Sequence, residues 1–523
     1  MLLDRTFHPD EANQAFITGR LLETGAYLYN PKDYHGPTLY YTAAAIQKAA
    51  GNSSTATLDP TLLRCTPLLF AVLTLLLGFS AIRKISKSCV GGIVFAALLG
   101  TAPIFPFFAT DFIQEMLLAC FSMMMFWAAT SYLLPVEVGK ERRKGRSALI
   151  FGIAAGLAFA TKETCILSFA AAALAALPFL VKWRRQRQSN VEPSAGLHIS
   201  SHIVLALSGF LLTSALLYSS FTDNWHGVYD AFVTAPISYL HRAIGDASSN
   251  VAAAHIHPWW QYLKWTFLGN VVKDGNMHWT CRFSELTVSI YLLLLLPIAA
   301  TAFAFFRDRL KAIPTSLRNG FLFVCAYTAI LILLYSLIPY KTPWCSLQIL
   351  MGVMATFTLG YAAIGEILPG INQKKKWVRH LILCGFALSV IFGEHIPSIR
   401  AMMRNPDSRD IPYNYAAASP QVKDMANVVS EAIKGKRSPF PFVAVAIPTE
   451  DTWPLPFYLR TLNSKIGYWT QFEELKVLAD IGGKPDVVVV PAEDGHLVQS
   501  IFPYLKNTKR FEMRHRVRIR VFW

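Results

Sequence analysis

Two neighbouring carboxylates near the start of the chain are the first residues that could carry chemistry. Asp10 and Glu11 occur in the sequence His8-Pro9-Asp10-Glu11-Ala12. Neighbouring acids can take a proton from a hydroxyl group as a general base, or they can bind a divalent metal ion. Asp10 can also have a purely structural role, because an acid at a helix start caps the helix and favours its positive end.

A second polar motif follows the acidic pair. Tyr34-His35-Gly36-Pro37 begins about two dozen residues after Glu11 and leads into an aromatic and apolar run. The segment that contains both motifs is rich in acids, aromatic side chains and histidine. The combination favours a functional role for the acidic pair over simple capping.

Further ionisable residues lie at or just inside the ends of long apolar runs. Asp111 and Glu115 share one face if they belong to the same helix. Ionisable groups at membrane depth are costly and usually functional, so we expect both to line a cavity, although Asp111 could instead cap its helix. Lys162 and Glu163 are adjacent and cannot share a helix face, so we expect one to point into the cavity and the other to water.

Histidine and tryptophan are concentrated between residues 222 and 285. The set is Trp225, His226, His241, Arg242, His255, His257, Trp259, Trp260, His278 and Trp279. No pair of these histidines has the four-residue spacing and acid partner that are typical of a helical metal site, so the metal interpretation is weak. Amphipathic helices anchored at a membrane interface by tryptophan explain the composition better.

Long apolar runs must position these residues. Of the 523 residues, 53% are hydrophobic and 16% are charged, a balance typical of chains whose main solvent is lipid. A spanning helix needs ~20 mostly apolar residues. We identify ten runs: Leu62–Ile82, Cys89–Phe107, Asp111–Leu134, Ala148–Thr161, Cys165–Val181, His202–Phe221, Leu286–Phe305, Phe321–Pro339, Cys345–Ile367 and Val378–Ile396. These predict a polytopic α-helical membrane protein with about ten transmembrane helices.

The distribution of lysine and arginine predicts the orientation. Basic residues collect in five short connectors on one side of the predicted helices, around residues 83–87, 140–146, 182–187, 307–318 and 374–379. Positive residues near helix ends are retained in the cytoplasm, so we place these connectors inside. Topology thus accounts for the net charge of +16, and we expect no nucleic-acid partner.

This orientation places the polar motifs outside the cytoplasmic membrane. We divide the chain into a first extracytoplasmic loop with the acidic motif (1–61), a transmembrane domain (62–396) with a large outer loop (222–285), and an extracytoplasmic domain (397–523). The outward start also predicts one further spanning helix upstream of Met1.

The C-terminal segment has the pattern of a small α/β domain. Alternating runs at Phe442–Ile447, Asp486–Val490 and Val517–Phe522 predict strands. Ser419–Lys434 and Phe472–Ile481 predict helices, the first of them amphipathic.

The ordered motifs resemble a known class of membrane enzymes. Asp10-Glu11, His35-Gly36-Pro37 and Arg64 resemble the first outer loop of GT-C membrane glycosyltransferases related to protein O-mannosyltransferases, glycosyltransferase family 39. The chain is most similar to the family called flippase-activity-associated proteins. The motifs that carry this likeness are Phe112-Ile113-Gln114-Glu115, Thr161-Lys162-Glu163-Thr164, Tyr340-Lys341-Thr342-Pro343-Trp344 and Trp453-Pro454-Leu455-Pro456-Phe457-Tyr458-Leu459-Arg460.

Two features depart from the family pattern. Relatives usually have a helix before the Asp-Glu loop, which agrees with the helix expected upstream of Met1. Gly36 stands in the middle of the proline motif, where relatives have proline, so the equivalence of His35 with the family's second-motif residue stays open.

The resemblance implies transfer of a sugar, a mannose-type hexose or a similar one, from a polyprenyl-phosphate donor in the bilayer. The acceptor would be a glycan, a lipid or a protein on the outer face of the cytoplasmic membrane. Asp10 would be the base, and Glu11 would orient the acceptor or tune Asp10.

The same resemblance suggests a set of binding residues. Fixed cations would meet the donor phosphate: Arg64, Lys162 and Lys341. Arg64 and Lys341 could equally be snorkelling anchors. The substrate cavity would be formed by Tyr34, His35, Asp111, Glu115, Glu163 and Trp344. No metal ligand set is identified, and the need for a divalent ion stays open.

Two other classes of protein compete with an enzyme. One is a flippase, transporter or accessory protein for lipid-linked sugars, and the other is an inactive scaffold. Transporters of the common folds show two related halves and helices broken by Gly or Pro, and we find neither clearly. An acidic outer loop with an outer C-terminal domain therefore favours the enzyme.

Overall fold

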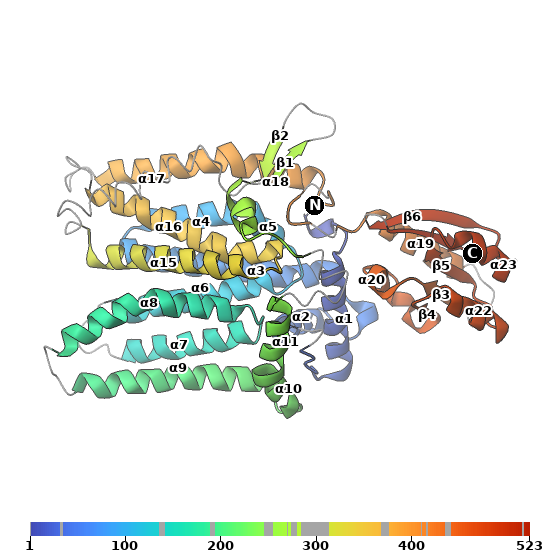
Figure 1. Cartoon of the computed structure of the whole chain (residues 1–523), viewed down its shortest axis with the longest axis horizontal. Coiled ribbons are helices and arrows are strands. Elements are labelled where there is room, and N and C mark those ends of the chain that lie inside the picture. Colours follow the sequence, from blue (N-terminus) through green and yellow to red (C-terminus); the bar gives the residue numbers. More distant parts are fainter. Residues whose placement is uncertain are drawn as a thin grey trace.

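The computed structural model describes residues 2–31, 35–134, 142–188, 194–244, 255–268, 270–273, 280–283, 313–367, 376–408, 411–414, 417–434, 441–514 and 517–523. It consists of a long bundle of helices and a smaller domain with a mixed sheet at one end (Figure 1). We call the end of the bundle that faces this C-terminal domain the domain end.

The bundle helices run along its length (Figure 1). They are α3 (Pro60–Ser86), α4 (Cys89–Thr101), α5 (Ile104–Ala109), α6 (Glu115–Leu133), α7 (Arg142–Phe159), α8 (Cys165–Gln188), α9 (Ser194–Tyr218), α15 (Thr315–Leu337), α16 (Ser346–Ile367), α17 (Lys376–Val390) and α18 (Ile396–Arg404). A π-helical turn joins α17 to α18. Among the described residues, seven segments are long and apolar enough to cross a membrane.

The predicted apolar runs correspond to these helices with three differences. The run Leu286–Phe305 lies outside the described residues. The run Cys89–Phe107 divides into α4 and α5, because Ala102 precedes Pro103 and has extended dihedral angles. The run Asp111–Leu134 begins its helix only at Glu115, so the prediction that Asp111 and Glu115 share a helix face is wrong.

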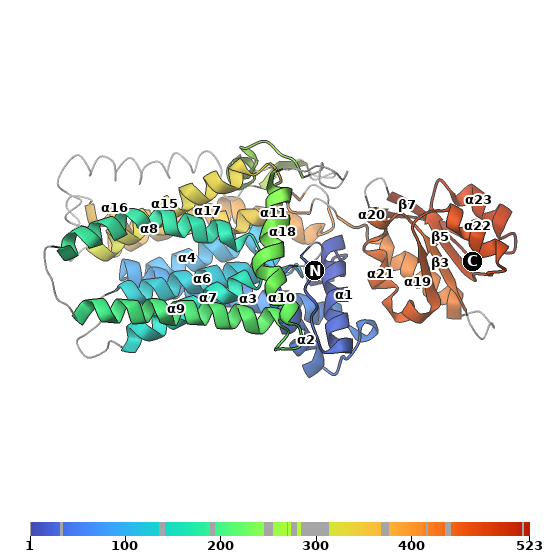
Figure 2. The same ribbon diagram turned by 60° about the horizontal axis from the view of Figure 1, so that its bottom comes forward.

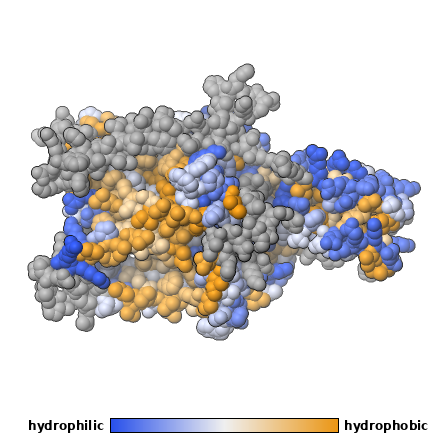
Figure 3. All heavy atoms as spheres, in the orientation of Figure 1, coloured by the Kyte–Doolittle hydropathy of each residue, from blue (hydrophilic) through white to orange (hydrophobic). Residues whose placement is uncertain are grey.

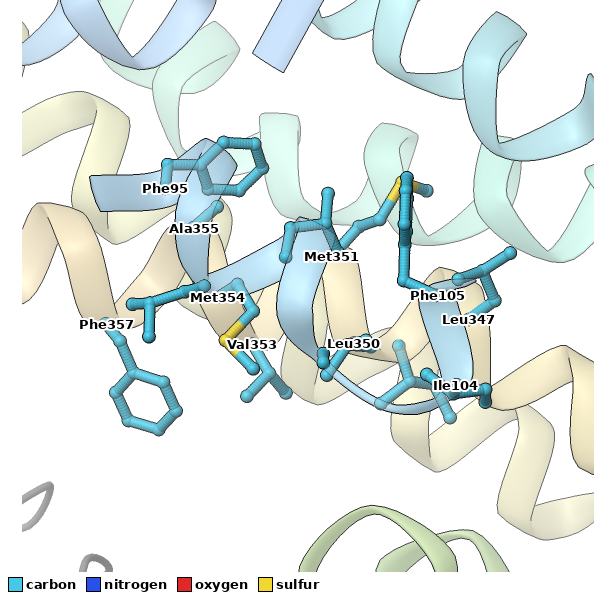
Figure 4. Packing of buried hydrophobic residues seen from close by; sticks show 14 of the residues in the cluster. Phe95, Ile104, Phe105, Leu347, Leu350, Met351, Val353, Met354, Ala355 and Phe357 are labelled. Atoms are coloured by element: carbon cyan, nitrogen blue, oxygen red, sulfur yellow. The ribbon is translucent and has the colours of Figure 1, made fainter. Parts of the chain in front are cut away.

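Helix α16 forms the centre of the bundle. Its spanning segment is 72% buried, the highest share among the seven. Its side chains interleave with Phe95 of α4 and with Ile104 and Phe105 of α5 (Figure 4). A helix that is apolar on most of its faces is expected at such a position, and the sequence of α16 has only one charged residue, Glu366.

Small residues bring α7 and α9 together. A Cβ atom added at Gly152 of α7 would lie 1.9 Å from the carbonyl oxygen of Ala206 on α9. Glycine therefore permits direct contact between the two helix backbones, the usual way in which apolar helices pack in a membrane.

Short helices cross the domain end of the bundle. Helices α1 (Pro9–Thr24) and α2 (Thr38–Ala49) lie between the bundle and the C-terminal domain (Figure 2). Helices α10 (Trp225–Tyr229) and α11 (Ala235–Ile244) cross the bundle end and carry exposed large apolar side chains, among them Trp225, Ile237 and Leu240. Such side chains suit a membrane interface.

The C-terminal domain contains a five-stranded sheet in the order β4-β3-β5-β7-β6. The strands are β3 (Val443–Ala446), β4 (Ile466–Trp469), β5 (Val487–Pro491), β6 (Thr508–Arg514) and β7 (Val517–Phe522). β3 is parallel to β4 and β5, whereas β7 is antiparallel to β5 and β6.

Helices cover both faces of this sheet. Helix α19 (Gln421–Lys434) packs on one face, and α22 (Glu473–Asp480) and α23 (Gly495–Ile501) pack on the other. Strands β3 and β5 are therefore buried on both sides, which explains why their sequences are continuous apolar runs. The predicted α/β domain is confirmed, with β4 and β6 in addition.

The bundle and the C-terminal domain differ in the polarity of their surfaces. The side of the bundle seen in Figure 3 is largely hydrophobic, and the C-terminal domain is largely hydrophilic. Leu76 of α3 and Leu212 of α9 are 59% and 71% exposed. Apolar side chains exposed in such numbers along helices of membrane-spanning length indicate contact with lipid.

Candidate functional site

The start of α1 gives its two acids different surroundings. His8 is the N-cap residue, and its Nδ1 accepts a hydrogen bond of 3.2 Å from the backbone N–H of Asp10. Glu11 completes the capping box, since its Oε2 accepts from the backbone N–H of His8 at 3.0 Å. Asp10 is therefore not the cap, and its side chain stays 45% exposed.

Glu11 is completely buried in an ion pair with Arg64 of α3. Its two oxygens accept from Nε and Nη2 of Arg64 at 2.8 and 2.7 Å. The backbone N–H of Phe112 also donates to Glu11, at 2.9 Å. Burial alone would raise the pKa of Glu11, but the charge and hydrogen bonds of Arg64 lower it to about 2. Glu11 is thus a fixed anion that holds α1 against α3.

This geometry corrects two predicted roles. Arg64 is 0% exposed, and its guanidinium also donates to the carbonyl oxygens of Leu3, Arg5 and Thr6. No N–H group of Arg64 is left for a lipid phosphate. Glu11 is equally enclosed, so its carboxylate is not accessible to an acceptor.

A second buried pair joins Arg5 and Asp111. Nη2 of Arg5 lies 2.7 Å from Oδ1 of Asp111 and donates to the carbonyl oxygen of Thr110 at 3.1 Å. Nη1 of Arg5 is buried and has no hydrogen-bond partner in the part of the chain that the structure describes. Burial and the neighbouring Glu11 carboxylate raise the pKa of Asp111 well above its ordinary value. Asp111 belongs to the connection between α5 and α6, so it neither caps a helix nor lies inside one.

A polar pocket adjoins the exposed face of Asp10. Its cavity volume is about 10 Å³, room for about one water molecule. Its lining residues are Arg5, Thr6, His8, Asp10, Phe107, Asp111, Ile113, Trp344, Tyr413 and Asn414. The structure thus brings residues from the N-terminal segment, the α5–α6 connection and the segment after α18 to one carboxylate.

His255 adds a group from the large loop to the same region. Its backbone carbonyl accepts from the N–H of Lys341 at 2.8 Å. Burial lowers the pKa of His255, and the charge of Asp10 opposes this effect, so the two side chains lie within electrostatic reach. The sequence analysis named His255 only within the histidine-rich loop, because its distance from Asp10 along the chain gave no sign of their proximity. Arg5 was missed, because it belongs to no motif.

Lys162 lies beside Trp344, which is one of the residues that line the pocket. Nζ of Lys162 forms a buried ion pair with Glu115 and lies 5.1 Å from the ring centroid of Trp344. Burial opposes the charged form of Lys162, but Glu115 beside it raises its pKa above the ordinary value. Trp344 also lines the Asp10 pocket, so its indole ring links the buried cation to the exposed carboxylate.

An apolar cavity begins further along the same helices. It has a volume of about 120 Å³ and is lined by residues of α6, α7, α8, α15 and α16. Ser122 lies two turns along α6 from Glu115, and Gln348 lies one turn along α16 from Trp344. Most other lining residues are apolar, among them Phe126, Phe169 and Met351. The cavity therefore lies in the depth of the bundle, beyond Glu115 and Trp344 along the chain.

The motifs around His35 and Glu163 pack directly on each other. The N–H of Gly36 donates to the carbonyl oxygen of Thr161 at 3.2 Å. A Cβ atom at Gly36 would lie 2.2 Å from the carbonyl oxygen of Ala160, so only glycine permits this approach. The need for close packing explains the glycine that departs from the family pattern.

Glu163 is directed to His35 rather than to water, and its side chain is only 12% exposed. Its two oxygens lie 3.0 Å from Nδ1 of His35 and 3.0 Å from the hydroxyl of Tyr29, which donates. Burial would raise the pKa of Glu163, but His35 lowers it below its ordinary value. Lys162 and Glu163 thus point into two different buried clusters. Tyr34 lies outside the described residues.

Lys341 has a structural contact of its own. Its Nζ donates to the carbonyl oxygens of Ser336 and Ile338 at the C-terminal end of α15. A cation at this position satisfies carbonyl groups that the helix leaves free. The contact supports an anchoring role over the predicted contact with a donor phosphate.

The described residues hold no cluster of three or more His, Cys, Asp or Glu side chains that could bind a metal ion. At the pocket, Asp10 and His8 form one such pair, with 3.6 Å between Oδ2 and Nδ1. Two ligands are fewer than a stable metal site needs.

The bundle, the short helices across its end and the small C-terminal domain together define the class of fold. The fold is that of the GT-C membrane glycosyltransferases. The crystal structure of ArnT from Cupriavidus metallidurans bound to undecaprenyl phosphate has 13% sequence identity and a TM-score of 0.59, covering 99% of this chain and 94% of ArnT. The apo structure of the same ArnT has 14% identity, a TM-score of 0.54 and the same coverage.

Comparisons based on sequence find no relative. No protein-family model matches the chain, and no curated protein matches it. The GT-C assignment therefore concerns the fold.

Proposed function

We propose that this protein is a membrane glycosyltransferase that moves a sugar from a polyprenyl-phosphate donor to a hydroxyl group of an acceptor. The observation that carries the proposal is the contrast between Asp10 and Glu11. One carboxylate is buried and fixed by Arg64, and the next is exposed in a pocket at the end of a membrane-spanning bundle.

Asp10 is the general base. The acceptor hydroxyl attacks the anomeric carbon of the sugar and loses its proton to Asp10. A new bond forms between the acceptor oxygen and the anomeric carbon, and the bond from that carbon to the phosphate oxygen breaks. The polyprenyl phosphate leaves with the bonding electrons. His8 cannot donate a hydrogen bond from Nδ1 to the Asp10 carboxylate, because this nitrogen accepts from the backbone N–H of Asp10. This nitrogen therefore does not compete with the acceptor hydroxyl for the carboxylate oxygens.

Lys162 and Trp344 bind the donor. The phosphate approaches Lys162, whose charge stabilises the leaving group. The sugar stacks on the face of Trp344, and the polyprenyl chain extends into the apolar cavity between α6, α8, α15 and α16. This arrangement agrees with the fold shared with ArnT, whose structure is described with bound undecaprenyl phosphate.

The domain end of the bundle is the extracytoplasmic side in this proposal. The basic connectors support this orientation, because positive residues near helix ends are retained in the cytoplasm. The protein is then a multi-pass protein of the cytoplasmic membrane, with Asp10 and the C-terminal domain outside.

Sugar transfer in reconstituted vesicles tests the proposal. The purified protein is incubated with a panel of radiolabelled polyprenyl-phosphate sugars and membrane extract as acceptor, with and without EDTA. We expect one donor to give labelled product with the parent and at least 100-fold less with Asp10→Asn. The matched control is Asp424→Asn, which changes an exposed acid of α19 and should transfer normally.

Each other outcome has a definite meaning. Equal transfer by the parent and by Asp10→Asn would remove Asp10 as the base. Movement of labelled lipid across the bilayer without any product would exclude the transferase and favour a flippase. Loss of activity in EDTA, restored by a divalent ion, would add a metal to the mechanism.

A further inference from the structure

Four side chains form a continuous stack between the C-terminal domain and the first helix. The guanidinium carbon of Arg64 lies 4.4 Å from the ring centroid of Phe7. The rings of Phe7 and Phe457 are stacked, with 4.3 Å between centroids and an interplanar angle of 11°. The guanidinium carbon of Arg460 lies 4.3 Å from the ring centroid of Phe457. Two of these residues, Phe457 and Arg460, come from the C-terminal domain.

Hydrogen bonds fix the same contact. The hydroxyl of Tyr458 accepts from the backbone N–H of Phe7 at 2.9 Å. Nη2 of Arg460 donates to the carbonyl oxygen of Leu58 at 2.8 Å. Phe7 and Phe457 are 1% and 0% exposed, so the contact is as dry as a protein core.

The stack ends on the residue that holds the acidic pair. Arg64 contacts Phe7 with one face of its guanidinium and hydrogen-bonds Glu11 through the edge. Phe7 directly precedes the helix cap His8. A displacement of Phe457 must therefore be transmitted to the first turn of α1, where Asp10 lies. We call these four contacting side chains the brace, since cation–ring and ring–ring contacts of this kind are attractive.

The segment between the bundle and the C-terminal domain also contacts the residues before α1. Oδ1 of Asp407 accepts from the backbone N–H of Thr6 at 2.8 Å. Tyr413 and Asn414 line the pocket beside Asp10. The C-terminal part of the chain thus contacts both the helix that carries Asp10 and the space that Asp10 faces.

We propose that the C-terminal domain is a positioning device for Asp10 and that Phe457 and Arg460 are its positioning residues. The inference rests on the proposed function, because it concerns the same carboxylate. The domain sets the position of the carboxylate through the stack of Arg460, Phe457, Phe7 and Arg64. A misplacement of about 1 Å in a reacting group can lower a rate by roughly a hundredfold, so the stack affects turnover more than donor binding.

A simple attachment of the domain to the bundle makes a different prediction. In that case, any substitution that weakens the domain should lower activity to the same extent as a change in the stack. Phe502 provides the matched control, because it is 2% exposed and belongs to the core on the other face of the sheet, away from Phe7.

The test compares Phe457→Leu with Phe502→Leu in the full chain. Three quantities are measured: kcat, KM for the donor, and hydrogen exchange of the backbone amides of residues 8–14. We expect Phe457→Leu to lower kcat by at least tenfold with KM changed less than twofold, and to speed exchange at the start of α1. Phe502→Leu should leave kcat, KM and the exchange at the start of α1 unchanged.

A double variant sharpens the result. Because Phe7 and Phe457 act through one contact, Phe7→Leu combined with Phe457→Leu should lower kcat no further than either single change. Equal losses of kcat in Phe457→Leu and Phe502→Leu would overturn the proposal. Unchanged exchange at the start of α1 in Phe457→Leu would overturn it too. If the parent transfers no sugar, the proposed function fails, and the exchange experiment still decides whether the brace exists.

Discussion

Arg64→Met should destabilise the protein strongly. The substitution leaves the carboxylate of Glu11 buried without its partner, together with three backbone carbonyl groups that Arg64 now satisfies. Removing one member of a buried ion pair costs about 3–5 kcal/mol of folding free energy. The lowered pKa of Glu11, about 2 instead of 4.5, corresponds to about 3 kcal/mol by linkage and gives the same order of magnitude.

The assay is thermal unfolding in detergent, followed by tryptophan fluorescence. The unfolding midpoint should fall by several degrees in Arg64→Met, whereas Arg83→Met should shift it by less than one degree. Arg83 is an exposed residue at the other end of the same helix, so it controls for the loss of an arginine from α3. Addition of Glu11→Gln to Arg64→Met should restore part of the loss, because no unpaired charge then remains buried. A midpoint of Arg64→Met equal to that of the parent would refute the assignment of this pair as the support of α1.

Three further predictions concern neighbouring features. The stability that Glu11 contributes is present above its ordinary pKa of 4.5 and is lost as the pH falls toward 2, so unfolding midpoints should drop over that range in the parent and less in Glu11→Gln. Gly36→Ala should lower the unfolding midpoint and the yield of folded protein, because its methyl group would lie 2.2 Å from the carbonyl oxygen of Ala160; a midpoint equal to that of the parent would contradict the close packing. Lys162→Met should raise KM for the donor at least tenfold, while Lys162→Arg should keep most of the affinity; equal KM values in both variants would exclude Lys162 from donor binding.

The sequence predicted the elements better than it predicted the roles of individual side chains. The apolar runs correspond to the bundle helices, because the length and composition of a spanning helix are set by the bilayer. The buried strands β3 and β5 were recognisable as apolar runs. β4 and β6 were missed, because their side chains are mostly partly buried or exposed and their sequences alternate little.

The division of labour between Asp10 and Glu11 could not be read from the sequence. Two adjacent acids at a helix start look alike until the partner of each is known. Arg64 is 53 residues away from Glu11 along the chain, and only the folded structure shows that Arg64 pairs with Glu11 and not with Asp10. Arg5 has the same explanation, since its partner Asp111 belongs to a different part of the chain.

The adjacency of Lys162 and Glu163 has a consequence for communication within the molecule. A single peptide unit connects a side chain beside Trp344 to a side chain beside His35. A movement of this peptide unit displaces both side chains together. Where such a movement accompanies binding at one cluster, thermodynamic linkage requires an equal coupling free energy for binding at the other.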